Sequence, residues 1–285
     1  MRGRERALRV AIRLAVFVVL SLAGLNLSGT ALYWLTGNLL LTSALAVFLA
    51  ATVANAVLMR IYEGAPLVEV GFAWTGAGRR NLLLGLVAGM GAALVLVAGA
   101  VASPAAEWEA IGAETAGWPS VLFVVVLLAL GAAGEEMLFH GYGFQVLMAT
   151  LGPWGAILPV SLLFALAHTG NLNVNALGLA NTFGWGLLLG YAFWRSGDLW
   201  LPIGLHAGWN WALPLAGIPL SGFTMNLTGY AVRWKAGPLW SGGEYGLEGS
   251  ILTSAILLVL FPVLRSLPIE RQPAFLLAAR GEARC

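Results

Sequence analysis

Two adjacent glutamates, Glu135 and Glu136, follow a long apolar run in the sequence. A charged side chain at the centre of a membrane helix costs roughly 2.5–3.5 kcal/mol on insertion scales, and acids kept at such positions usually serve a function. Two of the three histidines, His168 and His206, also stand in apolar surroundings downstream. Because a carboxylate with an imidazole can activate water as a general base, these residues indicate a polar chemical site inside an apolar protein.

Helical spacing separates the roles of the two glutamates. Neighbouring residues on a helix point about 100° apart, so Glu135 and Glu136 cannot easily share one partner. Glu136 and His140 are four residues apart and therefore lie on one helix face. We expect Glu136 to pair with His140, which leaves Glu135 free to face His168 and His206.

A second pair with helical spacing is formed by His206 and Asn210. Residues four apart on a helix point the same way, and an imidazole beside an amide can stabilise the oxyanion of a tetrahedral intermediate. His168 ends the sequence FALAH, one turn after Phe164. Together with Glu135 these groups describe hydrolysis of an amide bond by activated water.

The elements that carry these residues are predicted to be membrane helices. The 285-residue chain is 59% hydrophobic and only 10% charged, whereas soluble domains average about 25% charged residues. Only helices or closed barrels satisfy their backbone groups in lipid, and the apolar runs are too long for barrel strands. We predict an all-α polytopic membrane bundle of about eight transmembrane helices, with residues 1–285 forming a single integral membrane domain. The predicted spans are Val10–Leu27, Leu39–Leu58, Leu82–Ala102, Val121–Leu138, Trp154–His168, Leu177–Trp194, Leu199–Leu215 and Ile251–Leu264.

The basic residues predict the orientation in the membrane. With the N-terminus in the cytoplasm, Arg233 and Lys235 are the only two of the 15 basic residues outside the cytoplasmic side. The first span begins like a signal peptide but has no convincing cleavage site, so we expect it to be retained. We expect both termini in the cytoplasm and the site open to that side. The arginine-rich composition suggests the plasma (inner) membrane of a bacterium.

Three motifs in this order resemble the CPBP family, which includes CAAX-type prenyl endopeptidases and bacteriocin-processing or Abi proteins. The family pattern is Glu-Glu-x-x-x-Arg, often ending Phe-Arg-Gly, then Phe-x-x-x-His, then His-x-x-x-Asn. The chain has GEEMLFHG at Gly134–Gly141, followed by Phe164–His168 and His206–Asn210. The resemblance covers roughly Val121–Trp211 and predicts a catalytic core at about 119–215.

The resemblance implies a role for each matching residue. Glu135 would be the general base on water with the assistance of His168, and His206 and Asn210 would form the oxyanion hole. The implied activity is hydrolysis of a peptide bond in a membrane-associated peptide or protein, CAAX-like or otherwise lipidated or tethered.

The net charge of +2, without a basic stripe, argues against a nucleic-acid partner. The alternative is a transporter or scaffold that uses the Glu/His cluster as a proton or cation relay.

Four further residues would support the site by the same resemblance: Glu136, Phe139, His140 and Phe164. His140 departs from the family, because it stands where the pattern has arginine. Arginine is always charged and forks onto carboxylates, whereas histidine is smaller and can be neutral. We therefore expect activity to depend on pH, and we expect His140→Arg to be tolerated.

A metal is the remaining alternative at this site. Glu135, His168 and His206 would be the ligands of a zinc ion, since catalytic zinc uses three protein ligands and a water. The sequence has no HExxH pair and no evident outer carboxylate to orient such ligands. A metal-free glutamate mechanism without cofactor is therefore favoured. Simple spans place His168 at the outer end of its helix, so it meets Glu135 only if the fourth helix runs past His140 or the fifth helix is tilted or re-entrant.

Overall fold

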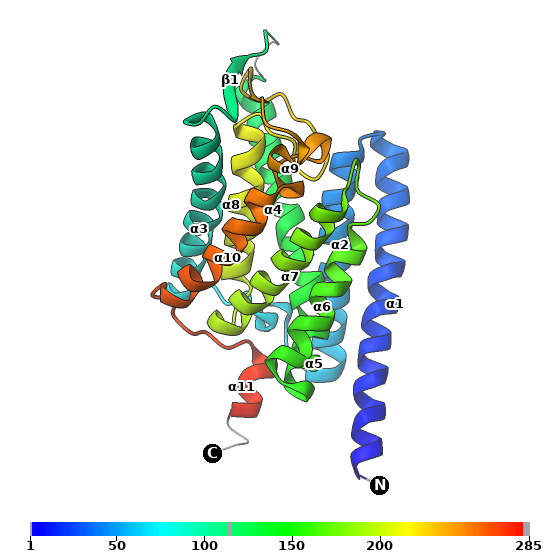
Figure 1. Ribbon diagram of the computed structural model, residues 1–285. Helices are drawn as coiled ribbons and strands as arrows, with labels where there is room; N and C mark the ends of the chain where they lie inside the picture. Colours follow the sequence, from blue (N-terminus) through cyan, green and yellow to red (C-terminus); the bar gives the residue numbers. More distant parts are fainter. Residues whose placement is uncertain (1, 113–115, 282–285) are drawn as a thin grey trace.

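The computed structural model describes residues 2–112 and 116–281, and within them the chain is a bundle of helices (Figure 1). The helices are α1 (Arg2–Thr36), α2 (Leu39–Leu58), α3 (Gly76–Val101), α4 (Trp118–His140), α5 (Tyr142–Leu151), α6 (Pro153–Ala167), α7 (Ala176–Ser196), α8 (Trp200–Leu215), α9 (Pro238–Ser241), α10 (Ile251–Ser266) and α11 (Phe275–Gly281). Short π or 3-10 turns lie at Met59–Glu63, Leu67–Val70, Gly243–Tyr245 and Leu247–Gly249.

The predicted fold class is confirmed, because each of the eight predicted spans falls on a helix. Within the described ranges, five helical stretches are long and apolar enough to cross a membrane. These stretches are Arg4–Thr36, Leu39–Glu63, Gly76–Val101, Trp118–Leu151 and Ala176–Ser196. The helices α6 and α10 are shorter apolar helices, and α8 has 16 residues. The protein is thus a polytopic helical membrane protein, and a total of eight crossings stays a prediction.

The helix α8, which carries His206 and Asn210, packs very closely on α3. Glycines on both helices make this approach possible: a Cβ at Gly85 would collide with the backbone of Leu201, and a Cβ at Gly204 with the backbone of Leu82. Small residues let membrane helices approach to backbone contact. The position of α8 is therefore fixed by α3 along its length.

The helix that carries the glutamates is interrupted directly after His140. Asn55 of α2 is fully buried at this break; its amide nitrogen donates to the carbonyl of Met137 at 3.0 Å, and its oxygen accepts from the Tyr142 N–H at 2.7 Å. Gly141 lies against Asn55 with no room for a Cβ. One asparagine thus satisfies the backbone groups that the break would orphan and ties this end of α4 to α2.

The helices around the break bring His168 to the depth of Glu135. The fourth helix was predicted to run on past His140; α4 ends at His140, and the separate helix α5 extends the helical stretch to Leu151. The 15 residues of α6 span only about 22 Å, less than the roughly 30 Å of a bilayer core. His168, at the end of α6, therefore lies inside the bundle.

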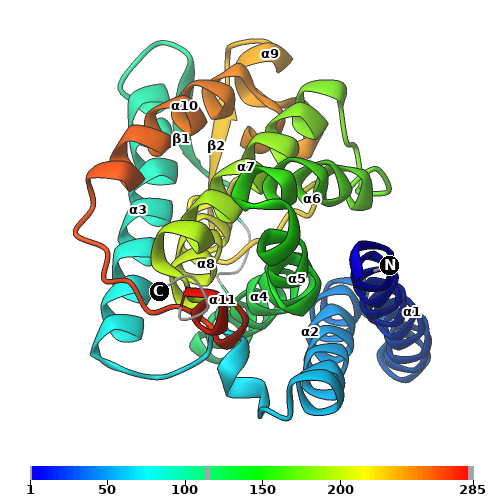
Figure 2. The same ribbon diagram turned by 90° about the horizontal axis from the view of Figure 1, so that it is seen from below.

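The two ends of the bundle differ in structure. The N-terminus and the C-terminal helix α11 lie at one end (Figure 1). At the opposite end, strand β1 (Ala106–Ala110) pairs antiparallel with β2 (Tyr230–Trp234), with Ala106 opposite Trp234 and Ala110 opposite Tyr230. Figure 2 shows α4 and α8 surrounded by other elements, with α1 at the edge. The two helices that carry Glu135 and His206 are thus held in the interior.

Candidate active site

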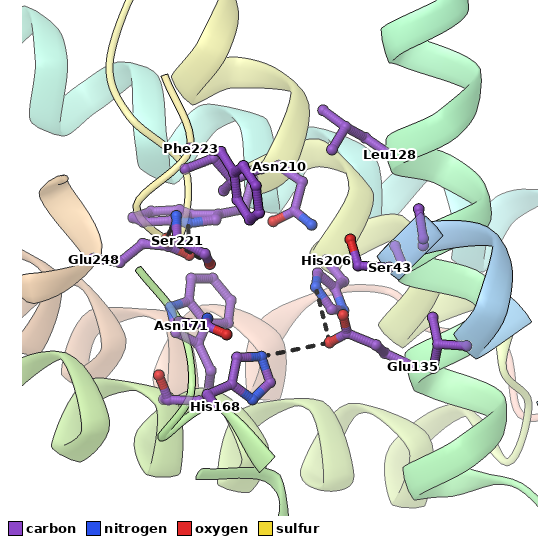
Figure 3. Close-up of a pocket in the computed structure, with 18 of the residues that line it drawn as sticks. Ser43, Leu128, Glu135, His168, Asn171, His206, Asn210, Ser221, Phe223 and Glu248 are labelled. Carbon is purple, nitrogen blue, oxygen red and sulfur yellow. Dashed lines mark hydrogen bonds and ion pairs between the residues drawn. The ribbon is translucent and has the colours of Figure 1, made fainter. Parts of the chain in front are cut away.

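A pocket of about 210 Å³ contains the predicted site (Figure 3). Its wall is formed by α2, α4, α6, α7 and α8, together with the segment 220–225 and Glu248. All four residues predicted to be catalytic line it: Glu135, His168, His206 and Asn210. Segments more than 70 residues apart in the chain therefore converge on one cavity.

Glu135 faces both histidines across the floor of the pocket. Its Oε2 atom lies 3.7 Å from Nε2 of His168 and 3.9 Å from Nε2 of His206 (Figure 3). This oxygen has no hydrogen-bond partner among the described residues. The side chain of Glu135 is 28% exposed and lines the pocket, while its Oε2 atom is buried with no hydrogen bond to satisfy it.

The other nitrogen of each imidazole is already bonded. Nδ1 of His168 donates to the carbonyl of Phe164 at 2.7 Å, and Nδ1 of His206 contacts Oε1 of Glu136 at 2.8 Å. A carbonyl and a carboxylate can only accept, which places a hydrogen on both Nδ1 atoms. Each ring consequently presents Nε2 to Glu135.

Glu136 is buried completely and uses both of its oxygens. Oε2 accepts from Nδ1 of His140 at 2.7 Å, and Oε1 accepts from Nδ1 of His206 at 2.8 Å. The predicted contact with His140 is present, whereas the contact with His206 was not predicted. A buried carboxylate needs such partners to offset its lost hydration. Glu136 therefore orients an imidazole of the pocket from behind.

The two phenylalanines of the motifs hold the imidazoles in place. The rings of Phe139 and Phe164 are edge to face at 5.0 Å, and Phe164 lies 4.5 Å from the ring of His168 and 6.4 Å from that of His206. Such aromatic pairs are worth about 0.5–1.5 kcal/mol beyond their burial. The motif phenylalanines thus form an apolar side of the site.

One acidic residue of the pocket was missed in the sequence. Glu248 accepts the backbone N–H and the hydroxyl of Ser221 at 2.5 and 3.0 Å, and the indole N–H of Trp209 at 3.4 Å. Burial raises the pKa of Glu248 above its ordinary value. Its partners stand 27 and 39 residues away, so no local spacing could have marked it.

The lining of the pocket does not fit the expected opening on the same side as the termini. The pocket wall includes Asn171 after α6, the start of α2 and the segment 220–225, all at the end away from the termini. Apolar side chains fill the end nearer the termini, among them Tyr142, Ile157 and Phe193, which are at most 1% exposed. The pocket therefore opens at the end opposite the two termini.

The donor atoms suit a zinc ion in type and direction. Oε2 of Glu135 faces the Nε2 atoms of both His168 and His206. The expectation that no further carboxylate orients these ligands is wrong, because Glu136 binds Nδ1 of His206. No group of three such side chains in the described ranges is close enough to hold a metal as it stands. Ligand atoms around tetrahedral zinc are about 3.3 Å apart. The two separations from Glu135 Oε2 exceed this spacing by about half an ångström.

Residues 117–212 match the family model described as type II CAAX prenyl endopeptidase, Rce1-like. The matched segment contains both glutamates of α4 together with His168, His206 and Asn210. A search of the curated proteins finds no match. Over residues 117–212 the chain is therefore similar to the Rce1-like type II CAAX prenyl endopeptidases.

Proposed function

We propose that this protein hydrolyses a peptide bond of a membrane-associated peptide or protein, with Glu135 as the base that activates water. One observation carries the proposal: an unpartnered oxygen of Glu135 faces Nε2 of His168 and Nε2 of His206 in an otherwise largely apolar pocket. The separations of 3.7 and 3.9 Å are too long for direct hydrogen bonds, and in the proposed reaction a water takes up the unused hydrogen-bonding capacity of these groups.

Attack on the substrate begins at this water. Glu135 accepts one of its protons while the water oxygen bonds to the carbonyl carbon of the peptide. His168 accepts the second hydrogen bond of the water through Nε2, because its Nδ1–H is held by the carbonyl of Phe164. The two groups fix both the position and the orientation of the nucleophile, which is the condition for efficient general-base catalysis.

The negative charge that develops on the peptide oxygen is stabilised by His206 and Asn210. Nδ1 of His206 is held by the carboxylate of Glu136, so Nε2 faces the pocket and, when it carries a proton, donates to the oxyanion. Asn210 lies one turn farther along α8, and its amide points into the pocket (Figure 3). Loss of one such donor typically slows a reaction by about 100- to 1,000-fold.

The tetrahedral intermediate then collapses. Glu135 returns its proton to the leaving nitrogen, the carbon–nitrogen bond breaks, and an amine and a carboxylic acid are released. No external oxidant or co-reactant beyond water is needed. The catalytic core that carries these steps would be the segment of about 119–215, within a single membrane domain.

The substrate class follows from the wall of the pocket. Leu40, Val47, Leu128 and Leu189 supply apolar surface around the polar floor. An extended peptide with apolar residues near the cleaved bond, held at the bilayer by a lipid or a membrane segment, matches such a wall. Both a CAAX-like end and another tethered peptide satisfy this chemistry.

The favoured mechanism uses no metal, and a zinc mechanism is the alternative. Glu135, His168 and His206 would then hold the ion, which would supply Lewis acidity and an acidified water. Glu136 would orient His206 in either case. The two mechanisms differ in whether Glu135 takes a proton or binds the ion.

Cleavage of membrane-anchored peptides by the purified protein in detergent tests both points. We expect cleavage by the wild type to be unaffected by a chelator, and to fall by about 100- to 10,000-fold in Glu135→Gln. Glu244→Gln is the matched control, because Glu244 is an exposed glutamate outside the pocket.

The other outcomes are informative. Activity lost with chelator and restored by zinc would replace the metal-free mechanism with the zinc mechanism. Equal cleavage by wild type and Glu135→Gln would remove Glu135 from the reaction. No cleavage in any sample, together with pH-dependent ion flux in liposomes, would favour a relay instead of an endopeptidase.

A further inference from the structure

The floor of the pocket is closed toward the end of the molecule that carries the termini. Directly beneath Glu135, both oxygens of Glu136 are bonded to imidazoles, and the side chain is 0% exposed. Below this level Met137, Tyr142 and Phe193 are at most 2% exposed and belong to one packed cluster. A peptide arriving from the side of the termini would have to cross this layer.

The opposite end is where the pocket meets its surroundings. Its rim consists of Asn171, the segment 220–225 and Glu248, all in connections between helices. A side wall comes from Ser43 and its neighbours on α2. The helix α2 packs on α1 and α4, whereas α6 packs on α5 and α7. The rim and this side wall are therefore the surfaces that a substrate meets.

Charge distinguishes the two ends. Arginines gather at the closed end, at the start of α1 and α3 and at the ends of α2, α7 and α10 (Figure 1). They are Arg4, Arg6, Arg9, Arg13, Arg60, Arg79, Arg80, Arg195, Arg265 and Arg271. At the rim end, the basic residues of the described chain are Arg233 and Lys235, and both pair with glutamates of β1. Under the positive-inside rule the closed end is cytoplasmic.

From these observations we infer that the pocket takes its substrate from the outer, extracytoplasmic face of the membrane. The substrate class is then an exported peptide or protein segment that is tethered to the outer leaflet and extends apolar residues into the pocket. A cytoplasmic protein with a lipidated C-terminus cannot reach Glu135 in this arrangement. The inference rests on the proposed endopeptidase function for the nature of the substrate, but the sidedness of the pocket rests on the structure and the charges alone.

The single cysteine of the chain, Cys285, makes a direct test possible. In a Cys285→Ser background each introduced cysteine is the only thiol. Leu172→Cys places it beside the rim, since Leu172 contacts Gly222 and is 48% exposed. Arg60→Cys places it at the closed end, at an exposed position after α2. A membrane-impermeant maleimide is then applied to intact spheroplasts and, as a control for folding and reactivity, to detergent-solubilised protein.

We expect Leu172→Cys to be labelled in intact spheroplasts and Arg60→Cys only after lysis. Ser43→Cys, on the pocket wall, should follow Leu172→Cys and thereby report that the pocket itself is reached from that face. Labelling of Arg60→Cys but not Leu172→Cys in intact spheroplasts would overturn the inference, as would equal labelling of both.

A paired activity test separates this inference from the proposed function. The same tethered peptide is presented to wild-type protein with its cleavage segment either outside or inside the cell, and each reporter is also tested with purified protein in detergent. Cleavage of the outer reporter alone supports the inference. Cleavage of the inner reporter alone refutes the inference but retains the endopeptidase. A protein that cuts neither reporter in detergent contradicts the proposed function, while the labelling still decides the sidedness.

Discussion

The pocket beside Glu135 and the packed layer that contains Glu136 differ in whether their carboxylate oxygens have hydrogen-bond partners. In the pocket, one oxygen of Glu135 has no partner, and two imidazole nitrogens stand 3.7 and 3.9 Å from it. In the packed layer, both oxygens of Glu136 are bonded at 2.7 and 2.8 Å, and the side chain is excluded from solvent. The two carboxylates are adjacent in the chain and have the same chemistry, so their surroundings alone set them apart.

The difference shows how one helix serves two purposes. Because neighbouring residues on a helix diverge by about 100°, α4 directs one carboxylate into a cavity and the other into packed protein. The packed layer holds His206 through Glu136, and the pocket receives the free face of that imidazole. The imidazole of His206, which faces the pocket, is thus held in place by the fully hydrogen-bonded carboxylate of Glu136 in the packed layer.

The largest expected effect is a loss of folding stability when the hydrogen bonds of the packed layer are removed. In Glu136→Ala, His140 and His206 lose their common acceptor inside the protein. Removing one partner of a buried charged pair typically costs about 3–5 kcal/mol. The matched Glu135→Ala removes a partly exposed group without a hydrogen bond at Oε2, so its stability should stay within about 0.5 kcal/mol of the wild type.

Unfolding of the three proteins in detergent measures this contrast, with peptide cleavage measured in parallel. We expect Glu136→Ala to lose stability and activity together, and Glu135→Ala to lose activity alone. Equal loss of stability in the two variants would show that Glu136 in the packed layer contributes no more to stability than Glu135 in the pocket.

A smaller effect is expected where His140 replaces the arginine of the family pattern. His140→Arg keeps a cation on Glu136, so we expect cleavage to be retained and to vary less with pH, since arginine stays charged. The longer side chain must fit beside Gly190, where an added Cβ would stand 3.4 Å from Nε2 of His140. The same Cβ would stand 3.3 Å from Cγ1 of Ile157, so Gly190→Ala alone should lose about 1–3 kcal/mol of stability by overpacking.

Combining the two changes sharpens this prediction. The guanidinium and the new methyl group would compete for the same space, so the double variant should lose about 0.5–3 kcal/mol more than the sum of the single variants. Unfolding measurements on the four proteins give this coupling directly. Additive losses would mean that the arginine side chain adopts a conformation that does not occupy the space beside residue 190.

The sequence predicts those parts of the site that depend on local spacing. Apolar runs define the helices, and a separation of four residues predicts the contact of Glu136 with His140 and the common face of His206 and Asn210. The order of the motifs also predicts that Glu135 and His168 lie close together. These features are accessible because helix geometry converts a spacing into a direction.

Other features depend on contacts between distant segments and leave no local pattern. The bond between Glu136 and His206 joins residues 70 apart, and Asn55 caps the break after His140 from 87 residues before Tyr142. The opening was predicted on the side of the termini, whereas the pocket is lined toward the opposite end, because the position of α6 depends on its packing against α5 and α7. Tertiary packing, not propensity, decides such features.

The smallest expected effect is at the rim, from Glu248→Gln. Because burial raises the pKa of Glu248, the folded protein holds a proton at pH values where the unfolded chain has lost it, so this residue makes stability fall as pH rises through that window. Glutamine removes this contribution, and the variant should show a weaker decline in stability above pH 4.5, the ordinary pKa of glutamate. It still accepts from Ser221, and one hydrogen bond is worth about 0.5–1.5 kcal/mol, so kcat/KM should change by less than about tenfold. Unfolding from pH 4 to 8, with Glu244→Gln as the exposed control, measures the slope; an unchanged slope in Glu248→Gln would assign the rim carboxylate to solvent instead of to the buried wall of the pocket.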